Sequence, residues 1–489
     1  MLAEIIASIS ANLYTYVIII LLIVGGIYFT IRTKAVQVRT IKEQVKVVAE
    51  KPKDKKSVSS FHALMVSTAS RVGTGNIIGV SLALCLGGFG SVFWMWIIAI
   101  IGSASAFLES TLAQIYKKKG LNGCYGGPAY YIEKALKCRP LAIIFSILLV
   151  LTYGVGFNML ASFNLQSTFK TYGFYDANIT PWIIGGIVAI IVGYCLFGGG
   201  KRIVKITSFL VPIMGIAYIL LALVVVVLNI TAIPSVFARI FVEAFDFKAI
   251  FGGFGGSCVM YGIRRGLFSN EAGVGSAPNA SASAEVSHPV KQGLVQVLSV
   301  FIDTLLVCSA TAFMCMCSGV EPTGSDGAVY IQTCVKAVFG NFGPIFITVA
   351  MALFAFTTLI GNLFYVNQSF NHLFGKEPNK TFNYIYYVIA SLLILLGAGL
   401  NSPVLWDIAD IFMGLMAIIN MIVITILSPK AIMALKDYTK KKKAKEECVF
   451  LAKDIGITVQ LDYWQEIDIK TDVSTKQTEE DIKTQSIGL

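Results

Sequence analysis

Apolar segments recur along almost the whole chain, separated by short polar and basic stretches. A run of about 20 apolar residues is long enough to cross a bilayer as a helix. The pattern therefore predicts an all-α polytopic membrane protein. It has eleven candidate transmembrane helices, at residues 12–31, 61–84, 91–115, 140–168, 181–198, 206–229, 250–268, 290–318, 343–371, 382–400 and 404–428. Two shorter helices are expected outside these spans, one begun by Pro128 and one over 327–339.

The composition supports a membrane protein, because 56% of the 489 residues are hydrophobic and only 14% are charged. The net charge of +11 does not indicate nucleic-acid binding, since the Lys and Arg residues concentrate between apolar segments, as in cytoplasmic loops. This distribution places the N-terminus outside and the C-terminus in the cytoplasm. The first span follows an acidic start and lacks a cleavage pattern, so we expect it to be retained.

One glycine-rich run interrupts the second span, from Ala69 to Gly79, with the sequence ASRVGTGNIIG. Three glycines in seven residues disfavour a continuous helix. At membrane depth, a broken helix is tolerated where its freed backbone groups face protein or a watery cavity. The run therefore suggests a binding site, although glycines also allow two helices to pack closely.

A second glycine-rich run, GGFGGS at residues 252–257, falls in the seventh span. Without the first span, the remaining ten divide into two sets of five, and each set begins with a glycine-broken helix. Because five is odd, the second set enters the membrane from the opposite side, which gives an inverted repeat typical of transporters. The chain is thus divided into an extra helix with a basic loop (1–60), two five-helix repeats (61–229 and 230–430) and a charged tail (431–489).

Several blocks resemble the alanine or glycine:cation symporter family. The strongest is GGFGSVFWMWIIAIIG at Gly87–Gly102, followed by Arg71–Gly79, Gly126–Ile132, Arg265–Gly275 and Phe354–Thr358. The resemblance covers about residues 10–435. It implies a prokaryotic plasma-membrane carrier that couples Na⁺ entry to uptake of a neutral amino acid. It also implies a ten-helix core like that of the leucine transporter, preceded by one extra helix.

A zwitterionic substrate needs donors for its carboxylate and acceptors for its ammonium. The N–H groups of Thr74, Gly75 and Asn76 suit the carboxylate, because a half-helix is expected to begin there. Carbonyl groups of the second run suit the ammonium. The Phe254 ring of this run either lines the side-chain pocket or faces lipid and neighbouring helices. The residues of that run are Gly253, Phe254, Gly255, Gly256 and Ser257.

Na⁺ prefers oxygen ligands, and the adjacent hydroxyls of Thr357 and Thr358 supply two. The resemblance implies that the carbonyl groups of Ala69, Val72 and Phe354 complete the site. The alternative to a Na⁺ site is that each threonine hydroxyl donates a hydrogen bond to a carbonyl oxygen of its own helix.

The chain departs from the family pattern near the expected pocket. Ala161 replaces a glutamine shortly after Asn158, Asn362 replaces a tryptophan, and Asn367 replaces an acidic residue. We place Asn158 and Asn362 in the substrate site. The smaller residues enlarge the pocket, so the substrate is alanine, glycine or the larger glutamine.

Other functions are weaker interpretations. A proton-coupled symporter and a non-transporting amino acid sensor remain alternatives, the latter using the charged tail as its output. A channel filter, a catalytic triad and a metal-spaced His/Cys set do not stand out in the sequence, so neither an enzyme nor a resident cofactor is expected. The expected partners are Na⁺, a small neutral amino acid and the lipid bilayer. The oligomeric state is open and a monomer is compatible with the sequence. Buried charges such as Arg71, Arg265 and Glu271 are candidates for gating pairs.

Overall fold

Long apolar helices dominate the computed structural model, which describes residues 2–50, 58–120, 123–246, 253, 257–322, 324, 326–400 and 402–465. Within these residues, eight helices are long and apolar enough to cross a membrane, or nine if one bent pair counts as a single span. The chain is therefore a helical, multi-pass membrane protein. The count of eleven stays a prediction, because the expected fifth span forms a helix of only 17 residues and the described helix in the seventh has 13.

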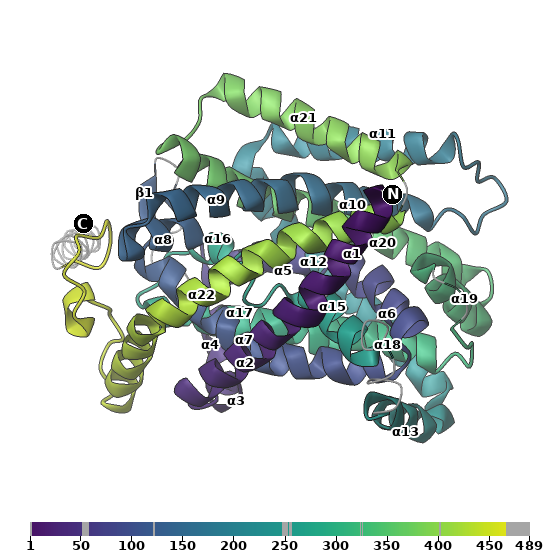
Figure 1. Cartoon of the computed structure of the whole chain (residues 1–489), viewed down its shortest axis with the longest axis horizontal. Coiled ribbons are helices and arrows are strands. Elements are labelled where there is room, and N and C mark those ends of the chain that lie inside the picture. The colour runs from purple at the N-terminus through teal and green to yellow at the C-terminus, as the bar shows by residue number, and fades with distance from the viewer. Residues whose placement is uncertain are drawn as a thin grey trace, which may run out of the picture.

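The first expected span is one continuous helix, and the second is broken between α5 and η2. The elements of this part are α1 (Leu2–Leu13), η1 (Tyr14–Ile18), α2 (Ile19–Arg32), α3 (Val36–Arg39), α4 (Ile41–Val48), α5 (Ser60–Arg71), η2 (Gly75–Gly79), α6 (Val80–Gly87) and α7 (Gly90–Ile115). α7 packs against α2, α15 and α17, so it joins the first span to the second half of the chain (Figure 1).

A two-stranded antiparallel hairpin follows, and then six α-helices with one short π-helical and one short 3-10 segment. They are β1 (Lys118–Gly120), β2 (Gly123–Tyr125), α8 (Pro128–Leu136), α9 (Arg139–Leu149), η3 (Val150–Gly156), α10 (Phe157–Ser167), α11 (Thr180–Leu196), α12 (Gly199–Leu228), η4 (Ile230–Ala232) and α13 (Ile233–Ala244). The Pro128 side chain starts α8 as expected, because proline suits the first turn of a helix.

The last part contains the longest helices. Its elements are α15 (Cys258–Asn270), α16 (Pro278–Ser281), α17 (Pro289–Val300), η6 (Phe301–Cys308), α18 (Ser309–Met316), α19 (Gly327–Phe339), α20 (Phe342–Phe374), α21 (Lys380–Gly399), α22 (Ser402–Lys443) and η7 (Ala452–Ile455). The short helix predicted over 327–339 is confirmed as α19. The long α22 crosses in front of the bundle and meets α1 near the N-terminus (Figure 1).

After α22, the chain folds back onto the bundle. The Phe450 N–H donates to the Ser287 carbonyl oxygen at 3.0 Å, and the Trp464 Nε1 donates to the Gln114 carbonyl oxygen at 2.9 Å. The Lys117 ammonium lies 4.9 Å from the centre of the Trp464 ring. Residues 448–465, which belong to the predicted charged tail at 431–489, therefore dock beside the end of α7.

Candidate functional site

The glycine-rich run does break the second span. α5 ends at Arg71 and the helix resumes after Gly73, with a bend of 51° between its two halves. The Asn76 side chain stabilises the break, because its Oδ1 accepts a hydrogen bond from the Gly73 N–H at 2.8 Å. η2, which carries Asn76, is a π-helical turn, and such turns are frequent at functional sites.

Helix α20 lies directly against this break. A Cβ atom on Gly361 of α20 would come within 2.8 Å of the Ser70 backbone nitrogen, and one on Gly73 would come within 2.0 Å of the Thr358 Oγ1. The Thr358 hydroxyl thus faces the break, and it is buried without a hydrogen-bond partner. A buried orphan oxygen beside freed backbone carbonyls suits a cation ligand.

The other predicted ligands of Na⁺ lie in the same region. Ala69, Val72 and Phe354 are buried, on the two sides of the contact between α5 and α20. The Thr357 Oγ1 lies 3.1 Å from the carbonyl oxygens of Leu353 and Phe354, which is the bonding back to its own helix described above as the alternative. This bond uses the hydroxyl proton and leaves lone pairs on Oγ1.

A chain of buried hydrogen bonds connects the two predicted asparagines to the break. The Asn362 Nδ2 donates to the Asn158 Oδ1 at 3.0 Å, and the Ser70 Oγ donates to the Asn362 Oδ1 at 2.6 Å. The Ser70 Oγ also lies 3.4 Å from the Glu271 Oε1, while the Ser276 Oγ donates to the Glu271 Oε2 at 2.6 Å. The Asn158 Nδ2 is buried without a partner, so it remains available to a ligand.

The predicted second break at residues 252–257 lies for the most part outside the described residues, which include only Gly253 and Ser257 of this run, so it stays a prediction. Gly253 is exposed, and Phe254, Gly255 and Gly256 lie outside the described residues. Ser257 caps the N-terminus of α15, and this helix continues without interruption to Asn270. A further interruption follows between Asn270 and Pro278, where Glu271, Gly273 and Gly275 have φ values of 53°, 86° and 90°.

This second interruption lies in the interior. Gly275 is confined by Phe145, Asn420 and Pro128, each within 3.0 Å of where a Cβ atom would be. A glycine is needed there both for space and for its positive φ. Sequence reasoning noted the block from Arg265 to Gly275, but it chose the denser glycine run upstream as the break.

Asp303 of η6 is a buried carboxylate at the same level as Asn76. Its Oδ1 accepts from the Asn76 Nδ2 at 2.7 Å, and its Oδ2 accepts from the hydroxyls of Ser269 and Thr304, each at 2.8 Å. Among the described residues, no Lys or Arg forms an ion pair with this carboxylate. Asp303 thus ties the first break to α15 through neutral donors.

The remaining groups around the first break are polar on one side and aromatic on the other. The Asn164 Nδ2 donates to the Thr74 Oγ1 at 3.1 Å. The Phe268 ring is 4.6 Å from that of Phe157 and 4.8 Å from that of Trp406, centre to centre. Phe268, which the sequence analysis did not single out, lies against the first break, because a Cβ atom on Gly75 would come within 2.8 Å of its ring.

The charged candidates for gating do not pair as suggested. The Arg71 Nη1 donates to the Gln296 Oε1 at 2.9 Å rather than to a carboxylate. The Arg265 Nη2 binds the Asp410 Oδ2 at 2.7 Å, and the Arg264 guanidinium bridges Asp407 and Asp410. These contacts link α15 to α22 and leave Glu271 in the polar chain around Ser70.

The structure is that of a helical, multi-pass membrane protein in which polar groups converge on breaks in two helices, an arrangement typical of transporters. Two solved structures are similar to the chain over most of its length. MhsT in complex with L-phenylalanine has a TM-score of 0.55 at 17% identity, over 76% of this chain and 88% of that one. A manganese transporter mutant from Eremococcus coleocola has a TM-score of 0.51 at 13% identity, over 85% and 84%.

The sodium:alanine symporter family model matches residues 1–452, and the chain belongs to this family. The resemblance inferred from the sequence blocks is thereby confirmed. The chain is 44% identical to the "Probable sodium/glutamine symporter GlnT" of Bacillus subtilis, over 95% of this chain and 96% of that protein. It is 43% identical to the "Amino-acid carrier protein AlsT" of the same organism, over 90% and 93%. It is 36% identical to the "Sodium/proton-dependent alanine carrier protein" of Bacillus sp. strain PS3, over 82% and 92%.

Proposed function

We propose that this protein is a secondary active transporter that couples Na⁺ entry to uptake of alanine, glycine or glutamine by alternating access. It acts in a prokaryotic plasma membrane, with the N-terminus outside and the C-terminus in the cytoplasm. The observation that carries the proposal is the first break, where an unpartnered Thr358 hydroxyl meets the freed backbone of Gly73. Family membership supports the coupled transport of an amino acid.

The substrate carboxylate binds at the start of η2. The first N–H groups of a helix have no partner within it and carry the positive end of its dipole. In this chain, Asn76 Oδ1 accepts the Gly73 N–H, and the Asn76 N–H donates to the Gly73 carbonyl oxygen at 3.2 Å. The N–H groups of Thr74 and Gly75 are therefore the ones that receive the carboxylate.

The substrate ammonium binds near the second interruption rather than at residues 253–257. Glu271 is 1% exposed, and its carboxylate accepts hydrogen bonds from the neutral hydroxyls of Ser70 and Ser276. A buried carboxylate is stabilised when a cation joins it. The freed carbonyl groups beside it add further acceptors for the three N–H bonds of an ammonium.

Na⁺ binds between α5 and α20, with oxygen ligands from Ala69, Val72, Phe354, Thr357 and Thr358. The Thr357 Oγ1 participates through its lone pairs, while its proton stays on the helix carbonyl oxygens. The ion then holds the two halves of the broken span against α20. Because the carboxylate site lies on the same break, bound Na⁺ organises it, which couples the two binding events.

Asn158 and Asn362 set the size and polarity of the pocket. The Asn362 amide stands where the family has a tryptophan, so it adds a hydrogen-bonding group that binds Asn158, and Ala161 is a small buried residue in place of a glutamine. A side-chain amide is the group that pairs best with another amide, which favours glutamine over alanine. The name of the 44% identical relative supports the same choice.

Proton coupling is a second candidate, because the name of the relative from Bacillus sp. strain PS3 includes a proton as well as sodium. The buried carboxylates Glu271 and Asp303 are groups that could carry a proton.

The test is uptake of labelled alanine, glycine and glutamine by proteoliposomes, with an inward Na⁺ gradient, with choline in place of Na⁺, and with a proton gradient alone. We expect Na⁺-dependent uptake of at least one of the three, with glutamine the best. Uptake driven equally by the proton gradient in choline would replace Na⁺ by H⁺ as the coupling ion. Failure of all three amino acids to move, with counterflow also absent, would favour a sensor and overturn the proposal.

A further inference from the structure

A basic pocket of about 600 Å³ opens between the end of α2, α3 and the last turns of α22. Six cationic side chains line it, and no carboxylate does: Arg32, Lys34, Arg39, Lys436, Lys440 and Lys443. These side chains come from two ends of the sequence that fold together. Such a concentration of like charge around a cavity needs an anion to offset its self-repulsion.

The arrangement of charges on α22 separates this pocket from the rest of the basic tail. Lys436, Lys440 and Lys443 recur at intervals of four and three residues, so they share one face of the helix. Lys441 and Lys442 point elsewhere and pair with acids, Lys441 with Asp437 and Asp454, and Lys442 with Glu43. The nearby carboxylates are therefore committed to lysines outside the pocket.

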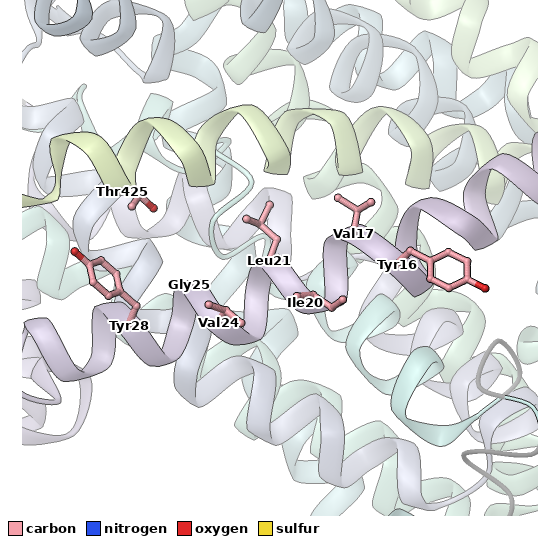
Figure 2. A pocket seen from close by; sticks show the side chains of 8 residues that line it. All are labelled: Tyr16, Val17, Ile20, Leu21, Val24, Gly25, Tyr28 and Thr425. Carbon is pink, nitrogen blue, oxygen red and sulfur yellow. The ribbon is translucent and has the colours of Figure 1, made fainter.

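An apolar groove of about 500 Å³ lies on the same pair of helices (Figure 2). Its lining includes Tyr16, Val17, Ile20, Val24 and Tyr28 of the first span, with Thr425 of α22 on the facing side (Figure 2). The Tyr16, Ile20 and Val24 side chains are 68%, 57% and 62% exposed. In a multi-pass membrane protein, an open groove of this kind along two spans faces acyl chains.

The groove and the basic pocket are neighbours along α2. Tyr28 lines the groove, Arg32 lines the pocket, and the Arg32 Nη1 donates to the Tyr28 hydroxyl at 2.6 Å. The two spaces thus follow each other within one helical turn, apolar first and cationic next. This order matches an amphiphile with a hydrocarbon chain and an anionic head group.

We propose that the seam between the first span and α22 binds an anionic phospholipid. Its phosphate lies among the six cations of the basic pocket, and one acyl chain lies in the apolar groove. Each part of the lipid has its own contact. Clusters of Lys and Arg at the end of a membrane helix attract phosphate head groups, and the groove supplies the hydrophobic contact for the acyl chain. The bound lipid would bridge the N-terminal and C-terminal helices of the chain.

The test measures which lipid stays bound to purified full-length protein after exchange into detergent that contains equal concentrations of phosphatidylglycerol and phosphatidylcholine. Native mass spectrometry identifies the bound lipid, and the wild type is compared with two triple variants. Wild-type protein should retain phosphatidylglycerol with about a tenfold preference. The variant K436Q/K440Q/K443Q should lose that preference. The control K201Q/K205Q/K376Q, which removes three exposed lysines outside the pocket, should keep it. Equal preference in the two triple variants would overturn the proposal.

Two further arms test the acyl chain. Soluble glycerol phosphate at the same concentration should not displace the lipid, and equal binding of glycerol phosphate would reduce the pocket to a simple anion site. The variant V17W/V24W fills the groove, so it should weaken binding of long-chain phosphatidylglycerol and spare the short dihexanoyl form. Unchanged retention of the long-chain lipid by this variant would show that the groove holds no acyl chain.

Discussion

Two neighbouring threonines behave differently in the structure. The Thr357 hydroxyl bonds back to its own helix, and the Thr358 hydroxyl is buried, unpartnered and directed at Gly73. If Na⁺ binds there, Thr358 contributes an oxygen that has no other role. The affinity of the site for Na⁺ then depends on the Thr358 hydroxyl more than on the Thr357 hydroxyl.

Replacing Thr358 should therefore weaken Na⁺ binding. We expect Thr358→Ala to raise the Na⁺ concentration for half-maximal uptake by about tenfold, the equivalent of one hydrogen bond to a charged group. Thr358→Ser, which keeps the hydroxyl, should stay near wild type. The measurement is uptake as a function of Na⁺ concentration in proteoliposomes. An unchanged Na⁺ dependence in Thr358→Ala would remove this residue from the ion site.

Glu271 carries the second prediction at this scale. Glu271→Gln keeps the shape and the contact with Ser276 and removes the charge, so the KM for the amino acid should rise by about tenfold or more. Glu321→Gln is the matched control, because Glu321 is 67% exposed and pairs with Arg239 far from the breaks. Equal KM values for the two variants would argue against an ammonium site at Glu271.

At the scale of elements, the first break depends on close approach between α20 and the backbone of Gly73. Gly73→Ala places a methyl group 2.0 Å from the Thr358 Oγ1, so α20 must shift or the hydroxyl must rotate away. We expect Na⁺-dependent uptake to be lost. Gly215→Ala is the control, since a Cβ on this α12 residue has nothing within 4 Å, and alanine favours a helix. Normal uptake by Gly73→Ala would show that the contact is dispensable.

The sequence predicted the apolar elements well, because membrane spans leave a strong compositional signal. The first break and the helix that begins at Pro128 were predicted from glycine and proline, which act locally on the backbone. The helix over 327–339 was predicted from its amphipathic pattern. The interruption after Asn270 was not singled out because EAGVG contains less glycine than GGFGGS. This interruption depends on positive φ at Glu271, Gly273 and Gly275 and on packing against distant residues, and the number of glycines in a run does not report either of these.

The polar chain of the site lay beyond sequence reasoning for a related reason. Ser70, Ser269 and Asn164 are ordinary residues in their own helices, and only the fold brings them to Asn362, Asp303 and Thr74. Asn362 could be proposed because it departs from the family pattern, and Asn158 because it precedes a second departure at Ala161. The structure brings the two asparagines together.

At the scale of the whole molecule, the docked C-terminal segment joins the end of α22 to α7. Trp464→Ala removes the hydrogen bond to Gln114 and the contact with the Lys117 ammonium, and should lower the stability of the protein by about 2 kcal/mol. The check is a lower midpoint of thermal unfolding in detergent with an unchanged KM for the amino acid, because Trp464 does not contact the breaks. An unchanged midpoint would show that this docking adds no stability.

The central claim is that Na⁺ and an amino acid cross together at the first break. The most direct measurement is entry of ²²Na⁺ into proteoliposomes at zero membrane potential, driven only by an inward gradient of glutamine, alanine or glycine. We predict that one of these amino acids accelerates Na⁺ entry in wild-type protein and that, at a Na⁺ concentration near the wild-type half-maximal value, Thr358→Ala strongly reduces the acceleration. Amino acid uptake that leaves the rate of Na⁺ entry unchanged would contradict the claim.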